Sequence, residues 1–338
     1  MASRIPKARD RTASDRASPV RDAAQYTAPT KGILSKVPAS WVPYGELMRI
    51  HQPHGIYMIY FPHLLGLMYA SAVQDVVVAP QTLGRCAAVL LIWTVFWRSA
   101  GCAWNDNIDQ DFDRKTTRCR NRPIARGAVS TANGHIFTLV LSLIAFGSLH
   151  LLPSECTLVG LASLALAMIY PFGKRFTYYP QVILGSTLGS TVSLSAYSVG
   201  LPALSPPYLG PTLCLSATVT LLVVFYDVVY ARQDTADDLK SGVKGMAVRF
   251  RNHIEGLLAV IVVSITGLLT MAGIMIGARQ SYYLFSVAGL TSGLVSLVAS
   301  TRWDLLHGWG VSSGWCYALA IASLVGGLAT EYVLYKLN

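Results

Sequence analysis

Nine long apolar stretches run through this 338-residue chain and limit the folds open to it. A bilayer with a hydrocarbon core of about 30 Å needs roughly 20 apolar residues per helix, and each stretch approaches that length. Only 13% of the residues are charged, against about a quarter in ordinary soluble domains. The pattern predicts an all-α, polytopic membrane protein with about nine transmembrane helices. The predicted spans cover residues 54–73, 82–104, 130–152, 155–173, 178–200, 208–230, 254–277, 281–300 and 312–335.

The positions of the basic residues give an independent test of this topology. The chain has 27 lysines and arginines. If the N-terminus faces the cytosol, all of them lie in cytosolic segments or, like Arg98, near the cytosolic end of a helix, except Arg85, Arg279 and Lys336. Such a bias marks the cytoplasmic face. The net charge of +10 thus reflects topology and contact with anionic lipid or diphosphate, and no nucleic-acid-binding module is visible.

Residues 1–40 are polar and rich in Arg, Ala, Ser and Pro. We expect a disordered, basic N-terminal tail there, followed by a single transmembrane domain at residues 41–338. An Arg- and Ser-rich start is typical of mitochondrial transit peptides, but Asp10, Asp15 and Asp22 interrupt it, and such peptides are poor in acids. We therefore favour a plain cytosolic tail, and an endomembrane of the ER type over the mitochondrial inner membrane.

Eight of the chain's 17 acidic residues gather in two short segments. We call NDNIDQDFD at residues 105–113 the first cluster and DVVYARQDTADD at residues 227–238 the second cluster. The predicted topology places both on one membrane face. Close like charges repel unless something positive lies between them, and a lipid-embedded chain has no stability reason to concentrate them. A divalent metal is the simplest missing partner.

Helical geometry selects three carboxylates in the first cluster. At 100° per residue, Asp106, Asp109 and Asp113 lie within about 60° of one another on a helix. Asp111 lies about 140° away from Asp106. Three carboxylates therefore share one predicted face.

The second cluster shows the same pattern. Asp227, Asp234 and Asp238 lie within about 40° of one another on a helix, and Asp237 is rotated by about 80°. An all-oxygen set built from both faces suits hard divalent cations, and Mg²⁺ in particular shares its ligands with substrate phosphates.

Basic residues surround the acids. Arg98 lies inside an apolar helix, where a charge needs a partner, whereas we interpret Arg118 and Arg120 mainly as topology signals. Lys174 and Arg175 add two cations on the same face. The mixture of signs fits a metal-bridged diphosphate, in which carboxylates hold the metal and cations neutralise the remaining phosphate charge.

Four motifs follow one another along the chain: NDxxDxxxD at residues 105–113, RxRP at 120–123, YPxxKRxTYxPQ at 170–181 and DxxYAxxDxxDD at 227–238. In this order, on nine apolar helices, they resemble the UbiA superfamily of intramembrane aromatic prenyltransferases. The resemblance covers about residues 45–335. The segment LMRIHQPHGIYMIYFP resembles the family's first-helix HKPxG signature, with Gln52 in the place of the lysine.

The resemblance implies a ring of nine helices around a central cavity that is capped on the polar side and open laterally to lipid. It implies that Asp106, Asp109 and Asp113 bind one Mg²⁺, with Asn105 assisting, and that the corresponding aspartates of the second cluster bind another. These six aspartates are the expected catalytic groups. The other expected substrate-binding residues are Arg49 beside the aromatic acceptor, Arg98, Arg122, Lys174 and Arg175 on the diphosphate, and Tyr178 and Tyr230 on phosphate or acceptor.

The sequences around the motifs look most like those of fungal members that prenylate polyketide-derived aromatics or pyrones in meroterpenoid pathways. Farnesyl is the common donor there, so the expected reaction is Mg²⁺-dependent transfer of a farnesyl group from its diphosphate to such an acceptor. One alternative is the 4-hydroxybenzoate polyprenyltransferase of ubiquinone biosynthesis. The other is a divalent-ion transporter, which would place its ionisable groups near the bilayer midplane, whereas both clusters here lie at helix ends.

Overall fold

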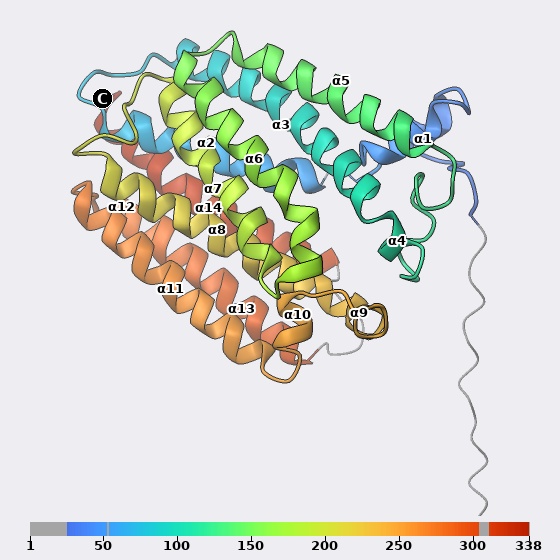
Figure 1. The fold of residues 1–338 in the computed structure, drawn as a ribbon. Coiled ribbons are helices and arrows are strands. Elements are labelled where there is room, and N and C mark those ends of the chain that lie inside the picture. The colour runs from blue at the N-terminus through green and yellow to red at the C-terminus, as the bar shows by residue number, and fades with distance from the viewer. Residues whose placement is uncertain (1–25, 53, 304–310, 338) are drawn as a thin grey trace, which may run out of the picture.

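A computed structural model describes residues 26–52, 54–303 and 311–337 of the chain. The described part contains helices and no strands (Figure 1), so the predicted all-α class is confirmed. Its long helices are α2 (His54–Val73), α3 (Pro80–Ile108), α5 (Thr131–Leu149), α6 (Ser154–Phe176), α7 (Pro180–Ser198), α8 (Leu209–Ala231), α11 (Ile254–Met275), α13 (Leu290–Trp303) and α14 (Val311–Tyr335).

Short helices cap or extend the long ones. The π-helix η3 (Tyr283–Gly289), preceded by α12 (Gln280–Tyr282), leads directly into α13. The others are η1 (Ile33–Lys36), α1 (Val42–Leu47), α4 (Gln110–Asp113), η2 (Arg232–Asp234), α9 (Thr235–Ser241) and α10 (Met246–Arg249).

Within the described residues, eight helices are long and apolar enough to cross a membrane. Helix α7 supplies the ninth long helix, and its many Gly, Ser and Thr residues distinguish it from the others. Most of α7 is buried between its neighbours, where small polar side chains permit close helix packing. The prediction of about nine helices is therefore confirmed, and the protein is a multi-pass membrane protein.

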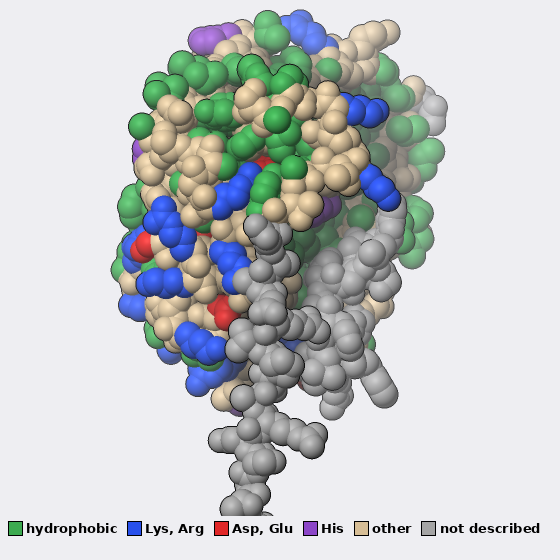
Figure 2. All heavy atoms as spheres, turned by 90° about the vertical axis from the view of Figure 1, so that its right-hand side faces the viewer, with side chains coloured by type: hydrophobic (Ala, Val, Ile, Leu, Met, Phe, Trp, Pro, Cys, Tyr) green, Lys and Arg blue, Asp and Glu red, His purple; other side chains and the backbone are tan. Residues whose placement is uncertain are grey.

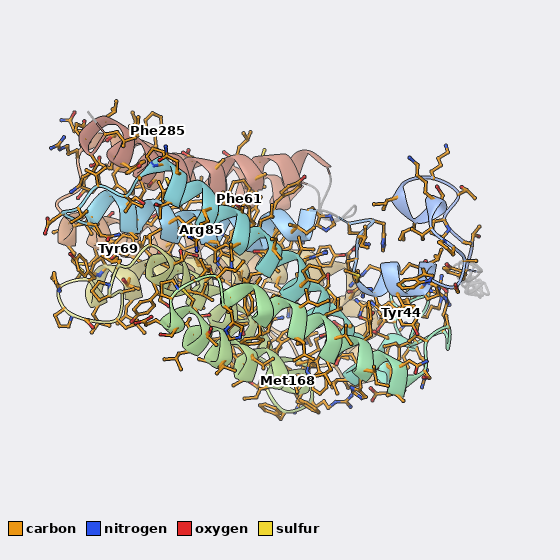
Figure 3. All side chains as sticks on the ribbon, turned by 90° about the horizontal axis from the view of Figure 1, so that it is seen from above. Tyr44, Phe61, Tyr69, Arg85, Met168 and Phe285 are labelled. Atoms are coloured by element: carbon orange, nitrogen blue, oxygen red, sulfur yellow. The ribbon has the colours of Figure 1, made fainter. Side chains whose placement is uncertain are left out.

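The nine long helices form a closed ring in chain order. Each packs against the next, and α14 packs against α2. Helix α2 also packs against α7 across the ring. Figure 3 views the bundle from above, with Tyr44 and Phe285 labelled near its opposite ends. Because successive helices alternate in direction, α3, α6 and α8 all finish at the end where Tyr44 lies.

Glycines allow the closest helix contacts in the ring. A Cβ added to Gly66 of α2 would lie 2.6 Å from the carbonyl oxygen of Val192 on α7. A Cβ on Gly185 or Gly189 of α7 would lie 2.6 Å from a backbone oxygen of α8, that of Thr220 or Ser216 respectively. The small-residue run at residues 185–193 thus serves helix packing.

The described part of the predicted tail packs against α1 and Arg126. Leu34 is buried beside Gly45, and the Tyr26 hydroxyl donates a 2.8 Å hydrogen bond to the Glu46 carboxylate. The Arg126 guanidinium pairs with the same carboxylate at 2.7 Å and lies 3.7 Å from the centre of the Tyr26 ring. Residues 26–40 therefore follow the surface of the domain, and residues 1–25 of the predicted disordered tail lie outside the described residues.

The close contact between α7 and α8 gives a first prediction. We expect Gly189→Ala to lower the free energy of unfolding by about 1–3 kcal/mol, because overpacking forces two backbones apart. Thermal unfolding of the purified protein in detergent measures this. Gly267→Ala on α11 is the matched control, since a Cβ there meets no atom within 4 Å. Equal melting temperatures for the two variants would contradict the predicted contact.

Candidate active site at the polar end of the ring

Ionic side chains gather at one end of the bundle. Figure 2 looks onto this end and shows many lysine and arginine side chains around a few acidic ones. Helices α3, α6 and α8 finish here, and residues 114–130 pass from the first cluster across to the second. Both clusters thus lie at the same end of the bundle, as the topology requires.

The first cluster is buried at the junction of α3 and α4. The side chains of Asp106 and Asp109 are 1% and 2% exposed, and that of Asp113 is 8% exposed. Asp111 is 47% exposed, which agrees with its predicted position off the shared face. The helix is interrupted at Asp109, which caps the end of α3 before α4 begins, but the three carboxylates remain on the inner side.

Two arginines neutralise the first cluster. The Arg49 Nη2 donates to both oxygens of Asp106 at 2.8 and 2.9 Å. The Arg122 Nη1 lies 3.1 Å from Asp106 Oδ1 and 2.9 Å from Asp113 Oδ2. Burial raises the pKa of Asp113 to about 6, and the attraction of Arg122 opposes that rise. A charge-assisted hydrogen bond of this kind offsets part of the cost of burying a carboxylate.

Lys174, at the end of α6, lies between the two clusters. Its ammonium group pairs with Asp109 Oδ2 and also attracts the carboxylates of Asp227 and Asp238. The side chain of Gln181 lies close to the Asp227 carboxylate, and its Oε1 accepts a hydrogen bond from the Met246 amide at 3.2 Å. The lysine and glutamine of one motif thus connect the first cluster, the second cluster and α10.

The segment at residues 114–130 contacts the second cluster directly. Arg118 donates from Nε and Nη2 to the Asp234 carboxylate, and the shortest of these contacts, from Nη2, is 2.6 Å. Its Nη1 donates to the Tyr230 hydroxyl at 3.1 Å. The Thr117 amide donates to Asp237 Oδ2 at 3.0 Å. These contacts join residues more than 100 positions apart in sequence.

Four residues expected to contact substrate have partners within the protein. Arg98 donates to three backbone carbonyls, those of residues 48, 49 and 52. Arg175 pairs with Asp111 at 2.7 Å on the exposed rim, and its hydrogen bonds lower the pKa of the Asp111 carboxyl. Tyr178 lies 5.8 Å from the Lys244 Nζ and 5.6 Å from the Arg249 Cζ, measured from the ring centre. Arg49, expected beside the acceptor, pairs with Asp106.

The donor set is compatible with a cation, although the carboxylates are not gathered around one point. Among the described residues, no three His, Cys, Asp or Glu side chains are arranged to hold a metal ion. Arginine and lysine occupy the spaces between the carboxylates. However, two buried oxygens of the first cluster, Asn105 Oδ1 and Asp109 Oδ1, have no hydrogen-bond partner. Unpaired buried oxygens are costly, and a hard cation is a chemically suitable partner for them.

The sequence does not predict the roles of two residues in this site. Arg118 was expected to be a topology signal, yet it forms the bidentate pair with Asp234. Gln181 belongs to a recognised motif but carried no predicted role, and it is buried against Asp227. The position of Gln181 in the same motif as Lys174 was the available signal for it.

Comparison with known proteins identifies the group to which this arrangement belongs. Residues 59–305 match the UbiA prenyltransferase family. The prenyltransferase ascA of Acremonium egyptiacum is 63% identical over 98% of this chain and 96% of its own length. The prenyltransferase stbC of Stachybotrys bisbyi is 51% identical over 92% and 94%. The DMOA farnesyltransferase nvfB of Aspergillus novofumigatus is 40% identical over 89% and 95%.

Solved structures share the fold. A UbiA homolog from Aeropyrum pernix superposes with a TM-score of 0.62 at 23% identity, over 83% of this chain and 97% of its own. A UbiA homolog from Archaeoglobus fulgidus bound to DMAPP and Mg²⁺ gives a TM-score of 0.61 at 16% identity, over 85% and 99%. At these identities the likeness establishes the arrangement of the helices.

The contact between Arg118 and Asp234 yields a second prediction. Arg118→Ala should weaken the attachment of residues 114–122 to η2 and α9, and we expect amide exchange in both segments to become about fivefold faster, since a bidentate but partly exposed pair contributes about 1 kcal/mol. Hydrogen exchange with mass spectrometry measures this. Lys115→Ala, an exposed position in the same segment, is the control. Unchanged exchange in the Arg118 variant would show that the pair does not hold the segment.

Proposed function

Because the chain belongs to the UbiA prenyltransferase family and is thus a prenyltransferase, we propose that it transfers a farnesyl group from farnesyl diphosphate to an aromatic or pyrone acceptor. We further propose that the acceptor is polyketide-derived and that the pathway is meroterpenoid biosynthesis in an ER-type membrane. The observation that carries the proposal is the meeting of both acidic clusters around Lys174, beside an apolar cleft in the helix ring.

The polar layer is suited to a diphosphate. Lys174, Arg118 and Arg122 each lie against carboxylates of the clusters and present donors where an anionic group would enter. Arginine matches phosphate geometry through its planar fork, and lysine acts as a mobile point charge. When bound, Mg²⁺ would neutralise the charge that grows on the departing diphosphate. The residues proposed to hold it are Asp106, Asp109, Asp113, Asp227, Asp234 and Asp238, with Asn105 assisting.

The apolar cleft is suited to an isoprenoid tail. It lies between α2, α8 and α14, with Met58, Phe61, Leu222 and Tyr317 among its lining residues, and its cavity volume is about 10 Å³. Figure 3 labels Phe61 in the middle part of α2. A long apolar chain gains about 0.8 kcal/mol for each CH₂ group removed from water, so a prenyl tail would be stabilised along this apolar lining once the side chains of α2, α8 and α14 move apart to admit it.

Aromatic rings connect this cleft to the polar layer. The ring centre of Tyr317 lies 5.2 Å from that of Tyr226, which stacks on Tyr230 at 6.0 Å. The Arg118 guanidinium lies 5.0 Å from the centre of the Tyr230 ring. Aromatic faces stabilise nearby cations, so a developing allylic cation at this position would face π electrons rather than water.

The proposed reaction breaks the allylic C–O bond, and both bonding electrons leave with the diphosphate. A ring carbon of the acceptor then attacks the allylic carbon, and loss of the proton from that carbon restores the aromatic system. The chain's own contribution is to bind the diphosphate, orient the two reactants and exclude water. The proton needs only a weak base.

The named relatives support the choice of donor. One of them is called a farnesyltransferase and is 40% identical over 89% of this chain. The high identity to ascA across nearly the whole chain supports a shared type of reaction.

Substrate choice can be measured directly. Membranes containing the protein are incubated with farnesyl, geranylgeranyl and longer prenyl diphosphates, each against a panel of phenolic acids and pyrones. We expect transfer from farnesyl diphosphate to a polyketide-type acceptor, with at least about tenfold discrimination, since several CH₂ groups of tail length alter the fit. Transfer only to 4-hydroxybenzoate from long donors would overturn the proposal.

The two clusters give a matched set of variants. Asp106→Ala and Asp234→Ala should each reduce transfer by at least about a hundredfold, because each removes charge needed to stabilise the leaving diphosphate. Both proteins should still accumulate in membranes. Asp111→Ala, in the same cluster but exposed on the rim, is expected to stay within about threefold of the unaltered enzyme. Full activity of either cluster variant at saturating Mg²⁺ would refute the assignment.

A further inference from the structure

Arg49 has an unusual backbone conformation. Its φ is 55°, and it is the one non-glycine residue with positive φ in the described part of the chain. It follows the end of α1, where the Ile50 amide donates to the Gly45 carbonyl and the Arg49 amide to the Glu46 carbonyl. This is the Schellman pattern, in which the left-handed position is usually glycine. For other residues that conformation costs about 1–2 kcal/mol.

The side chain explains why arginine occupies this position. Its Nη1 donates to the Glu46 carbonyl at 2.9 Å, and its Nη2 holds both oxygens of Asp106. Glycine would relieve the backbone strain but would leave the Asp106 carboxylate, 1% exposed, with Arg122 alone. The strained turn therefore places a guanidinium on the first cluster.

Arg98 holds this turn from the neighbouring helix α3. Its Nη1 lies 3.3 Å from the carbonyl oxygens of Met48 and Arg49, and its Nη2 donates to the Gln52 carbonyl at 3.0 Å. These carbonyls lie at or just beyond the end of α1, where they have no helical partner. One planar guanidinium thus contacts three acceptors on residues 48–52, of which the Arg49 carbonyl also accepts from the Gln52 amide.

Gly55 leaves room for the Arg98 guanidinium. A Cβ at Gly55 would lie 2.5 Å from both Nε and Nη2 of Arg98 and 2.8 Å from its Cζ. No side chain larger than hydrogen fits there without moving the arginine. The two residues therefore form one unit with the turn at residues 48–52.

We propose that Arg98 is a positioning residue that holds the turn at residues 48–52 so that Arg49 reaches Asp106, and that Gly55 provides the space it needs. The effect on catalysis rests on the proposed function, because Asp106 is a proposed Mg²⁺ ligand there. The effect on the turn does not, and it can be tested without any substrate.

The first test measures opening of the turn. Purified protein in detergent is digested briefly with trypsin, and mass spectrometry compares cleavage after Arg49 with cleavage after the exposed Lys36. Arg98→Lys keeps the charge but loses the fork, and Gly55→Ala displaces the fork without changing Arg98. In both, cleavage after Arg49 relative to Lys36 should become about tenfold faster, the change expected for losing one to two hydrogen bonds.

The matched control is Gly101→Ala on α3, where a Cβ meets no atom within 4 Å. Its cleavage ratio should equal that of the unaltered protein. An unchanged ratio in both Arg98→Lys and Gly55→Ala would overturn the proposal, whether or not the protein transfers farnesyl groups.

The second test asks whether Arg98 acts through Arg49. Arg49→Gly relaxes the turn and leaves Asp106 paired with Arg122, and its turnover is compared with those of Arg98→Lys and the double variant. We expect each single change to lower turnover and the double variant to be no slower than the slower single variant. A loss in the double variant equal to the product of the two single losses would show that Arg98 acts independently of Arg49. If the unaltered protein transfers no farnesyl group, the proposed function fails while the cleavage test still decides the role of Arg98.

Discussion

Neutralisation of buried carboxylates is the constraint on which this structure depends. Asp106 and Asp109 lie almost without solvent exposure at the end of an apolar helix ring, where an unpaired charge would cost several kcal/mol. Arg49, Arg122 and Lys174 come from three different parts of the chain to pair with the first cluster. The ring brings those parts together because α3 and α6 both finish at the same end.

The overall architecture could be predicted from the sequence for a simple physical reason. A bilayer imposes helix length, and the count of Lys and Arg fixes which loops share a side. Helical periodicity likewise separated the exposed Asp111 from the buried Asp106, because the backbone near the end of α3 stays close to helical. These predictions used properties of single segments.

Partners across the ring could not be read in this way. Arg118 and Asp234 are 116 positions apart, and their pairing depends on the path of residues 114–130. The sequence predicts that Arg98, a charge inside an apolar helix, needs a partner. In the structure that partner is a set of backbone carbonyls at the end of α1. Sequence indicates which side chains need partners. The tertiary structure determines whether that partner is an anionic side chain, a backbone carbonyl or the substrate.

The pairing of basic side chains with buried carboxylates also links the binding of diphosphate to the binding of the divalent cation in the proposed reaction. Arg122 and Lys174 cannot turn from their carboxylates to a diphosphate without leaving buried negative charge unpaired, which is strongly unfavourable. A divalent cation bound at those carboxylates removes that cost. Under the proposed function, diphosphate and divalent cation therefore each favour binding of the other, and this coupling is reciprocal. The second cluster is the more open half, since the Arg118 side chain that covers Asp234 is 37% exposed. Diphosphate is thus expected to displace Arg118 from Asp234 at a lower cost than it displaces Arg122 from Asp106.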